Sequence, residues 1–326
     1  MKKHNLAFLL ILLALSSYGQ VNIGISKSWA NIYVSELKQD VFDEIKNSKT
    51  IFVIPNELDE NSFKQIINNV WTINDIEFIS EDNFDYNKFS KNVIIKLINK
   101  EGRKDKVTFD SAVPDKTVKE YIIFNFSLFT PSQSNAVAQI FFTPNIKKRE
   151  VITNSSNRKS ILEKAIIKKK QKKNKEIAGF YNFELGYIKN YFQFLNSHLD
   201  KNINAKLRDL YIDKHEIKNL KKSTLFAPHW MMKRYDPFSS TIKKIEKPEK
   251  YFSKYNHNYA LISNEDLNNK ILNSKENFYY LMHTQVNENK IISVINGKTG
   301  NIIFRKTSKT SYNINSKDIS DLNKEI

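Results

Sequence analysis

The sequence predicts a mixed α and β protein of the α+β class, and three patterns support this prediction. Residues 50–79 have a strand, helix, strand pattern, residues 176–199 have the periodicity of an aromatic-faced helix, and residues 278–305 indicate an antiparallel meander. Only seven glycines occur in 326 residues. Folds that depend on repeated glycine turns, such as propellers and dinucleotide-binding sheets, are therefore disfavoured. No internal repeat is evident in the sequence.

The first nineteen residues have the three parts of a secretory signal peptide. Residues 1–5 are a short basic opening, residues 6–15 are ten consecutive apolar residues, and Ser17 and Gly19 place small side chains where a signal peptidase reads them. Ten apolar residues are too few for a membrane-spanning helix, which needs about twenty. We therefore expect residues 1–19 to be removed near Gln20 and the protein to be exported, either to the periplasm or to the extracellular space.

The chain contains no cysteine. Disulfides, thiolate metal sites and thiol nucleophiles are therefore excluded, and so is the lipidated cysteine that anchors bacterial lipoproteins. Stability has to come from the hydrophobic core, which a chain of this length can build, because about three quarters of the surface of a chain of about 300 residues is buried on folding.

Residues 20–145 are expected to form an α/β sheet domain. Residues 50–55 are an apolar strand that ends at a proline, and a second strand over residues 76–79 would complete a parallel pair. Between these strands, apolar residues recur at helical spacing, namely Phe63, Ile66, Ile67, Val70 and Trp71. Further strands are predicted over residues 93–98, 106–109, 121–129 and 137–142, with a turn at Glu101 and Gly102.

Residues 146–200 are expected to form a basic and then aromatic-faced helical region. Twelve basic and two acidic residues lie between positions 147 and 175, a local excess of +10 in a chain of formal net charge +17. A solvated helix surface is the simplest interpretation. The alternative is binding to an anionic envelope polymer, lipid heads or an envelope protein, with an affinity that falls steeply as salt rises. The residues expected to make this contact are Lys168, Lys169, Lys170, Lys172 and Lys173.

Specific recognition of nucleic acid is not expected from this region, because the lysine run is poor in arginine and contains no aromatic residue. The helix predicted after it places one glutamate, Glu184, inside its aromatic face. A carboxylate is expensive to desolvate at such a place. One interpretation is a structural bond to a tyrosine, lysine or arginine of another element. The other is a carboxyl group of raised pKa that lines a cleft and marks a functional site.

Residues 201–326 are expected to form an α+β region that ends in the β-meander. Residues 225–248 contain three prolines and little periodicity, so a long surface connection is predicted there. Residues 263–266 resemble a helix capping box, and a short helix is expected at the end of the chain. Gly297, Lys298 and Thr299 have the composition of a phosphate-binding loop, but Ile292 stands where that loop needs a glycine and a strand follows, so a hairpin turn is predicted.

The sequence contains no recognisable catalytic or metal-binding motif. No serine lies in a nucleophile-elbow sequence, and none of the five histidines after the signal peptide has a second histidine three to five residues away. We therefore predict an exported binding or assembly factor of the cell envelope that acts without a cofactor or metal. The alternative is an envelope hydrolase that uses Glu184 as its central carboxylate.

Overall fold

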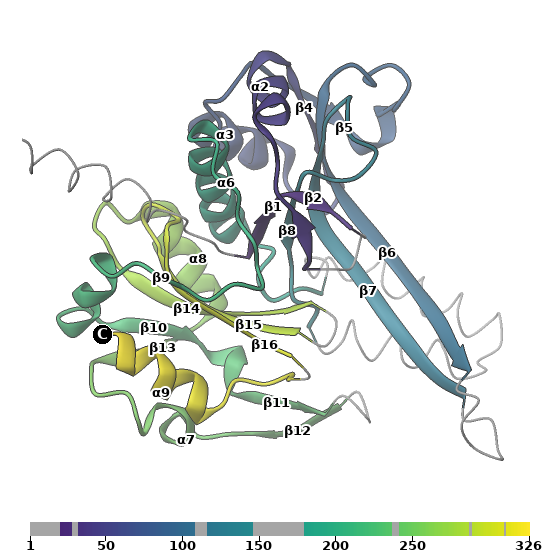
Figure 1. Cartoon of the computed structure of the whole chain (residues 1–326). Helices are drawn as coiled ribbons and strands as arrows, with labels where there is room; N and C mark the ends of the chain where they lie inside the picture. The colour runs from purple at the N-terminus through teal and green to yellow at the C-terminus, as the bar shows by residue number, and fades with distance from the viewer. Residues whose placement is uncertain are drawn as a thin grey trace, which may run out of the picture.

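The computed structural model of the chain describes residues 20–27, 32–107, 116–145, 179–236, 241–286, 289–309 and 311–326. Two six-stranded sheets with helices packed against them make up this part of the protein (Figure 1). Both sheets contain parallel and antiparallel pairs, so the predicted mixed α and β class is confirmed. The signal peptide predicted for residues 1–19 lies outside the described residues and stays a prediction.

The first sheet has the strand order β1-β8-β7-β6-β4-β5. Strand β4 is parallel to both of its neighbours, and the pairs from β6 to β1 are antiparallel. Its strands are β1 (Val21–Ile23), β4 (Thr50–Ile54), β5 (Ile76–Ser80), β6 (Val93–Val107), β7 (Lys116–Phe129) and β8 (Ala138–Phe141). The shorter elements of this half are β2 (Ile25–Ser26), β3 (Val34–Ser35), α2 (Gln39–Asn47) and η2 (Glu81–Asn83).

The predicted strand, helix, strand unit is present as β4, α3 (Glu60–Val70) and β5. Asp59 begins the helix, because its side chain accepts a hydrogen bond from the backbone N–H of Ser62 at 2.9 Å. Phe63, Ile67 and Val70 form the buried face of α3, as their spacing predicted. The element follows from the sequence because both its cap and its apolar periodicity are local.

The predicted turn at Glu101 and Gly102 is wrong. Both residues lie inside β6, where Glu101 pairs with Ile122 and Gly102 with Tyr121 in the register of β7. Cross-strand hydrogen bonding to β7 therefore continues through a glycine that the sequence alone marks as a break. The two long strands form an arm that extends well beyond the rest of the sheet (Figure 1).

The second sheet has the strand order β13-β10-β14-β15-β16-β9. The predicted meander is confirmed, because β14, β15 and β16 pair antiparallel in sequence order. Its strands are β9 (Tyr211–Ile212), β10 (Leu225–Pro228), β13 (Tyr259–Ile262), β14 (Tyr279–Val286), β15 (Asn289–Asn296) and β16 (Ile302–Ser308). The other elements of this half are η3 (Glu216–Lys221), η4 (His229–Met232), β11 (Lys233–Asp236), β12 (Thr241–Ile245), α7 (Pro248–Phe252), α8 (Asn264–Asn273) and α9 (Ser316–Glu325).

The predicted surface connection over residues 225–248 is wrong. Leu225–Pro228 is β10, an interior strand of the sheet that is parallel to β13 on one side and to β14 on the other. The elements η4, β11 and β12 follow it, and Trp230 is buried. Four residues are too few to display a periodicity, and the pairing partners of β10 lie far away in the sequence, so local patterns did not reveal this strand.

The two sheets share one topology, although the sequence shows no repeat. In each sheet an interior strand, β4 or β10, lies between the next two strands of the same sheet and is parallel to both. A meander then leads away from it, and a short early strand, β1 or β9, pairs with the last meander strand. The same arrangement of sheet strands therefore occurs twice along the chain.

Helix α6 (Leu185–Asp200) joins the two halves, because it packs against α3 of the first and α8 of the second. The predicted start of this helix is wrong, since residues 179–184 are not helical. Gly179 has a φ of 61°, and Phe180 forms a β-bridge with Pro144. Phe180 and Phe183 are buried, as predicted. Their burial comes from tertiary contacts, because neither residue belongs to the helix.

The segment between β15 and β16 is a hairpin turn, as predicted, and not a phosphate-binding loop. This turn packs against α6. The side-chain amide of Asn190 on α6 donates to the carbonyl of Gly297 at 3.1 Å, and Gln193 donates to the carbonyl of Lys298 at 3.2 Å.

The predicted cap at Ser263 and the final helix α9 are also present. None of the helices in the described part of the chain combines the length and the apolar character that crossing a membrane requires.

Candidate functional site

A pocket lies beside the carboxyl ends of the parallel strands β10 and β14. The pocket is partly open to solvent. Trp230 follows β10 directly in η4, and His283 lies in the second half of β14. The lining residues are Thr143, Pro144, Tyr181, Trp230, Met231, Lys233, Tyr235, His283, Tyr312, Asn313 and Ile314.

The topology of the second sheet favours a ligand site at this place. After β10 the chain forms β13 on one side, and through α8 it then forms β14 on the other side. The strand order therefore reverses at β10. In open α/β sheets, ligands bind in the crevice outside the carboxyl ends of the strands at such a switch point.

Trp230 is the central side chain of the pocket. Tyr181 stacks on its ring with centroids 4.3 Å apart and an interplanar angle of 2°, and the imidazole of His283 lies 6.0 Å away at 22°. Only 9% of the residue is exposed. Stacked rings of this kind have few accessible rotamers, so the wall they form is rigid.

The indole N–H of Trp230 is buried, and no described residue accepts a hydrogen bond from it. Leaving a buried donor unpaired costs about 1 to 3 kcal/mol. Tryptophans in well-packed cores usually avoid this cost, as Trp71 does by donating to Asn74 Oδ1 at 2.9 Å. The indole N–H of Trp230 is therefore a polar group of a pocket-lining residue that lacks an acceptor.

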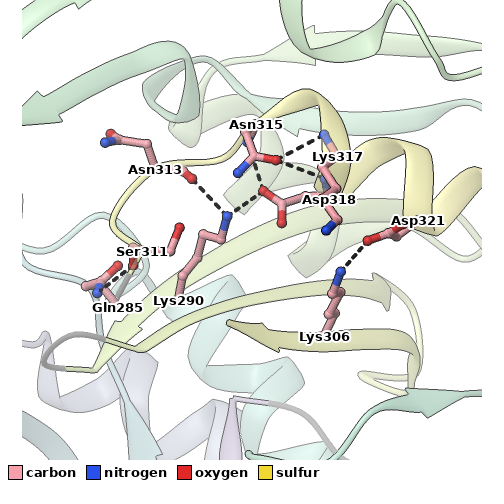
Figure 2. A network of polar contacts seen from close by, with 9 residues as sticks. All are labelled: Gln285, Lys290, Lys306, Ser311, Asn313, Asn315, Lys317, Asp318 and Asp321. Carbon is pink, nitrogen blue, oxygen red and sulfur yellow. Dashed lines mark hydrogen bonds and ion pairs between the residues drawn. The ribbon is translucent and has the colours of Figure 1, made fainter. Parts of the chain in front are cut away.

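A second wall of the pocket, residues 312–314, is fixed to β11 by Asn313. Its side-chain oxygen accepts from the backbone N–H of Tyr235 at 2.7 Å, and its side-chain amide donates to the Tyr235 carbonyl at 2.8 Å. Its own backbone carbonyl accepts from Lys290 Nζ at 3.0 Å (Figure 2). Asn313 thus holds the wall in place.

Lys290 also forms a buried ion pair that anchors α9 (Figure 2). Its Nζ lies 2.6 Å from Asp318 Oδ2, and the two side chains are only 1% and 5% exposed. Asp318 Oδ2 accepts a further bond from the backbone N–H of Asn315 at 2.8 Å, which completes the capping box of the helix. One lysine from β15 therefore fastens both the pocket wall and the start of α9.

The charge of the pocket lining is positive. Lys233 is exposed and has no ion pair with any described residue, and no aspartate or glutamate occurs among the lining residues of the described chain. The other side chains of the lining are aromatic, apolar or uncharged. The pocket therefore offers hydrogen-bond donors and apolar surface, without a carboxylate for acid or base chemistry.

The residues predicted from the sequence lie elsewhere. The lysines proposed to contact an anionic partner, Lys168 to Lys173, are outside the described residues, so their role stays a prediction. Glu184 is the residue before α6, is half-buried, and does not line the pocket. No described residue forms a hydrogen bond with its carboxylate. Burial raises the pKa of Glu184, and the nearby charge of Glu265 on α8 raises it further.

We expect the Glu184→Gln variant to be more stable than the wild type at neutral pH. A carboxyl whose pKa is raised above its ordinary value of 4.5 by folding binds its proton more tightly in the folded state. Stability is therefore lost as the pH rises from the unfolded pKa through the folded one. Because the group is half-exposed, the gain should stay below about 1 kcal/mol.

Urea unfolding of the wild type and of Glu184→Gln at pH 7 and at pH 3.5 measures this effect. The gain should disappear at the lower pH, where both states carry a protonated Glu184. Glu265→Gln is the matched control, and it should give a smaller gain at pH 7 because it removes only the repulsion between the two carboxylates. A Glu184→Gln variant that is less stable than the wild type at pH 7 would contradict the assignment.

Sequence reasoning missed the pocket because its parts come from distant segments. Tyr181 was assigned to a helix, Trp230 to a surface connection, and His283 was considered only as a metal ligand. A tryptophan three residues after the short apolar segment Leu225–Ala227 was the one local feature that pointed to it. No family model matches the chain, and no curated protein and no solved structure shows significant similarity to it.

Proposed function

We propose that this chain is an exported binding factor of the cell envelope and that the pocket around Trp230 is its ligand site. The single observation that carries the binding role is the buried, unpaired N–H of Trp230 at the switch point of the second sheet. The basic, apolar and small-residue sequence of residues 1–19 supports export.

The alternative of an envelope hydrolase rests on the raised pKa of Glu184 beside Glu265. A general acid and a second carboxylate close to each other are the groups that glycoside hydrolysis needs. However, Glu184 is not part of the pocket lining, and no carboxylate is. Binding is therefore the function that the geometry supports better.

Fluorine NMR on protein labelled with 5-fluorotryptophan tests the proposal. The sequence has three tryptophans, Trp29, Trp71 and Trp230, so the spectrum is simple, and Trp230→Phe identifies the resonance of interest. A fragment set that contains anionic, neutral and cationic compounds in equal number should yield binders that shift the Trp230 resonance in a saturable way. Trp71 should stay unchanged, because its N–H is already bonded to Asn74.

The protein for this experiment is isolated from the envelope fraction of its native cells. Its mass should correspond to an N-terminus at or near Gln20, and an intact Met1 would contradict export without affecting the pocket. The absence of any fragment that shifts the Trp230 resonance, or shifts of equal size at Trp71 and Trp230, would overturn the binding site.

A further inference from the structure

We propose that the ligand of this pocket is a small carboxylate with an aromatic or acyl body. This inference rests on the proposed function and gives it a substrate class. It follows from three properties of the lining: which hydrogen-bond donors are unused, which acceptors are already occupied, and where the positive charge lies.

The unused polar groups of the lining are donors. The indole N–H of Trp230 can only donate, and so can the ammonium group of Lys233. The first has no acceptor among the described residues and the second has no ion pair there. Bonds from N–H donors to an ionised carboxylate are shorter and about twice as strong as bonds to a neutral acceptor. The pair therefore favours an oxyanion over a neutral oxygen.

The side-chain oxygens of Asn313 and Thr143 in the lining already accept a hydrogen bond from the protein. Asn313 Oδ1 accepts from the backbone of Tyr235. Thr143 Oγ1 accepts from the backbone N–H of Gln285 at 3.2 Å and donates to the carbonyl of His283 at 3.2 Å. With no aspartate or glutamate in the described lining, neither the hydroxyl groups of a neutral sugar nor the ammonium group of an amine finds a strong partner.

The rest of the lining requires an apolar ligand body. Pro144, Met231 and Ile314 contribute aliphatic surface, and Tyr181, Tyr235 and Tyr312 contribute ring surface. Tyr235 and Tyr312 lie with their ring centroids 6.5 Å apart at 56°. A ligand that covered these side chains and directed its carboxylate to Trp230 and Lys233 would satisfy the donors and bury the apolar surface at the same time.

Three probes with one body test this inference by isothermal titration calorimetry: 4-phenylbutyrate, 4-phenylbutyramide and 4-phenylbutylamine. We expect the carboxylate to bind at least about tenfold more tightly than the amide, and the amine to bind most weakly. The affinity for the carboxylate should fall as salt rises, because the ion pair with Lys233 is partly exposed.

Two variants separate the two donors, and a third is the control. Lys233→Gln should reduce the affinity for the carboxylate towards that for the amide and leave the amide unchanged. Trp230→Phe keeps an aromatic ring, smaller than the indole, but removes the N–H. It should therefore weaken binding of the carboxylate and the amide, which both carry an acceptor, more than binding of the amine. Lys254→Gln replaces an exposed lysine outside the pocket and should change none of the three affinities.

The outcomes distinguish this inference from the proposed function. Equal or tighter binding of the amine or the amide, or a fragment set whose Trp230-shifting members are all neutral or cationic, would overturn the anionic class and leave the binding site standing. If no compound of any charge shifts the Trp230 resonance, both the proposed binding site and the proposed ligand class are overturned.

Discussion

Replacing Lys290 by methionine should lower the free energy of unfolding by about 3 to 5 kcal/mol, the cost of breaking a buried ion pair from one side. The methionine fills a similar volume, so little of the loss comes from packing. The loss arises because the Asp318 carboxylate, which is 5% exposed, stays in a buried site without its counter-ion. Equilibrium unfolding in urea measures the change from the shift of the midpoint at constant slope.

The double variant Lys290→Met with Asp318→Leu tests the cause. It removes both charges, so it should recover most of the stability that the single variant loses. Lys306→Met is the matched control, because Lys306 on β16 also pairs with a residue of α9, Asp321, but the two side chains are 29% and 20% exposed. Its loss should be about 1 kcal/mol or less. A Lys290→Met loss no larger than that of Lys306→Met would contradict the buried pair.

The Lys290→Met variant should also affect the pocket. Lys290 donates to the backbone carbonyl of Asn313 as well as to Asp318 (Figure 2). Its loss therefore frees the wall that carries Tyr312 and Ile314. Under conditions where the variant is still folded, we expect its Trp230 fluorine resonance to broaden, while that of Lys306→Met stays sharp.

Local patterns predicted the elements whose cause is local. The apolar spacing of Phe63, Ile67 and Val70 and the cap at Asp59 lie within one short stretch of the sequence, so α3 and the strands beside it followed directly. The β-meander also followed, because its strands are consecutive and joined by short connections. In both cases a residue and its structural partners are close together in the chain.

Long-range pairing decided the features that the sequence did not reveal. Strand β10 is only four residues long, and its place in the sheet depends on pairing with Tyr259–Ile262 and with the start of β14. The pocket combines Tyr181, Trp230 and His283 from three separate segments, so no single motif could encode it. Glu184 was predicted inside a helix and lies before it, because the Phe180 bridge to Pro144 delays the start of α6.

The strand topology is repeated in the two sheets although the sequence shows no repeat, and this has a simple physical explanation. Which strands become neighbours depends on the order of strands and helices, on connection lengths and on handedness, and much less on the identity of each side chain. The two halves differ in their connections, since β10 leads to β13 through η4, β11, β12 and α7, whereas β4 leads to β5 through α3 alone. The longer connection of the second half is what supplies Trp230, Lys233 and Tyr235 to the pocket.

Gly300→Ala should destabilise the protein by about 2 kcal/mol or more, the sum of a left-handed backbone and a clash that cannot relax. Gly300 has a φ of +75°, and a Cβ there would overlap the backbone carbonyl of Asn190 on α6. A backbone carbonyl inside a helix cannot rotate away. The affected contact is the one through which the β15–β16 turn of the second half meets the helix shared with the first.

Gly297→Ala and Lys298→Ala on the same turn give the comparison. A Cβ at Gly297 would overlap the buried ring of Phe278, so Gly297→Ala should also destabilise the protein, but without the left-handed backbone cost that Gly300→Ala adds. Lys298 is exposed, and its replacement should change the free energy of unfolding by no more than about 0.5 kcal/mol. Hydrogen exchange adds a local readout, because Gly300→Ala should speed exchange of the α6 amides around Asn190 more than exchange in α3. Equal stability of Gly300→Ala and Lys298→Ala would show that the turn does not hold the two halves together through α6.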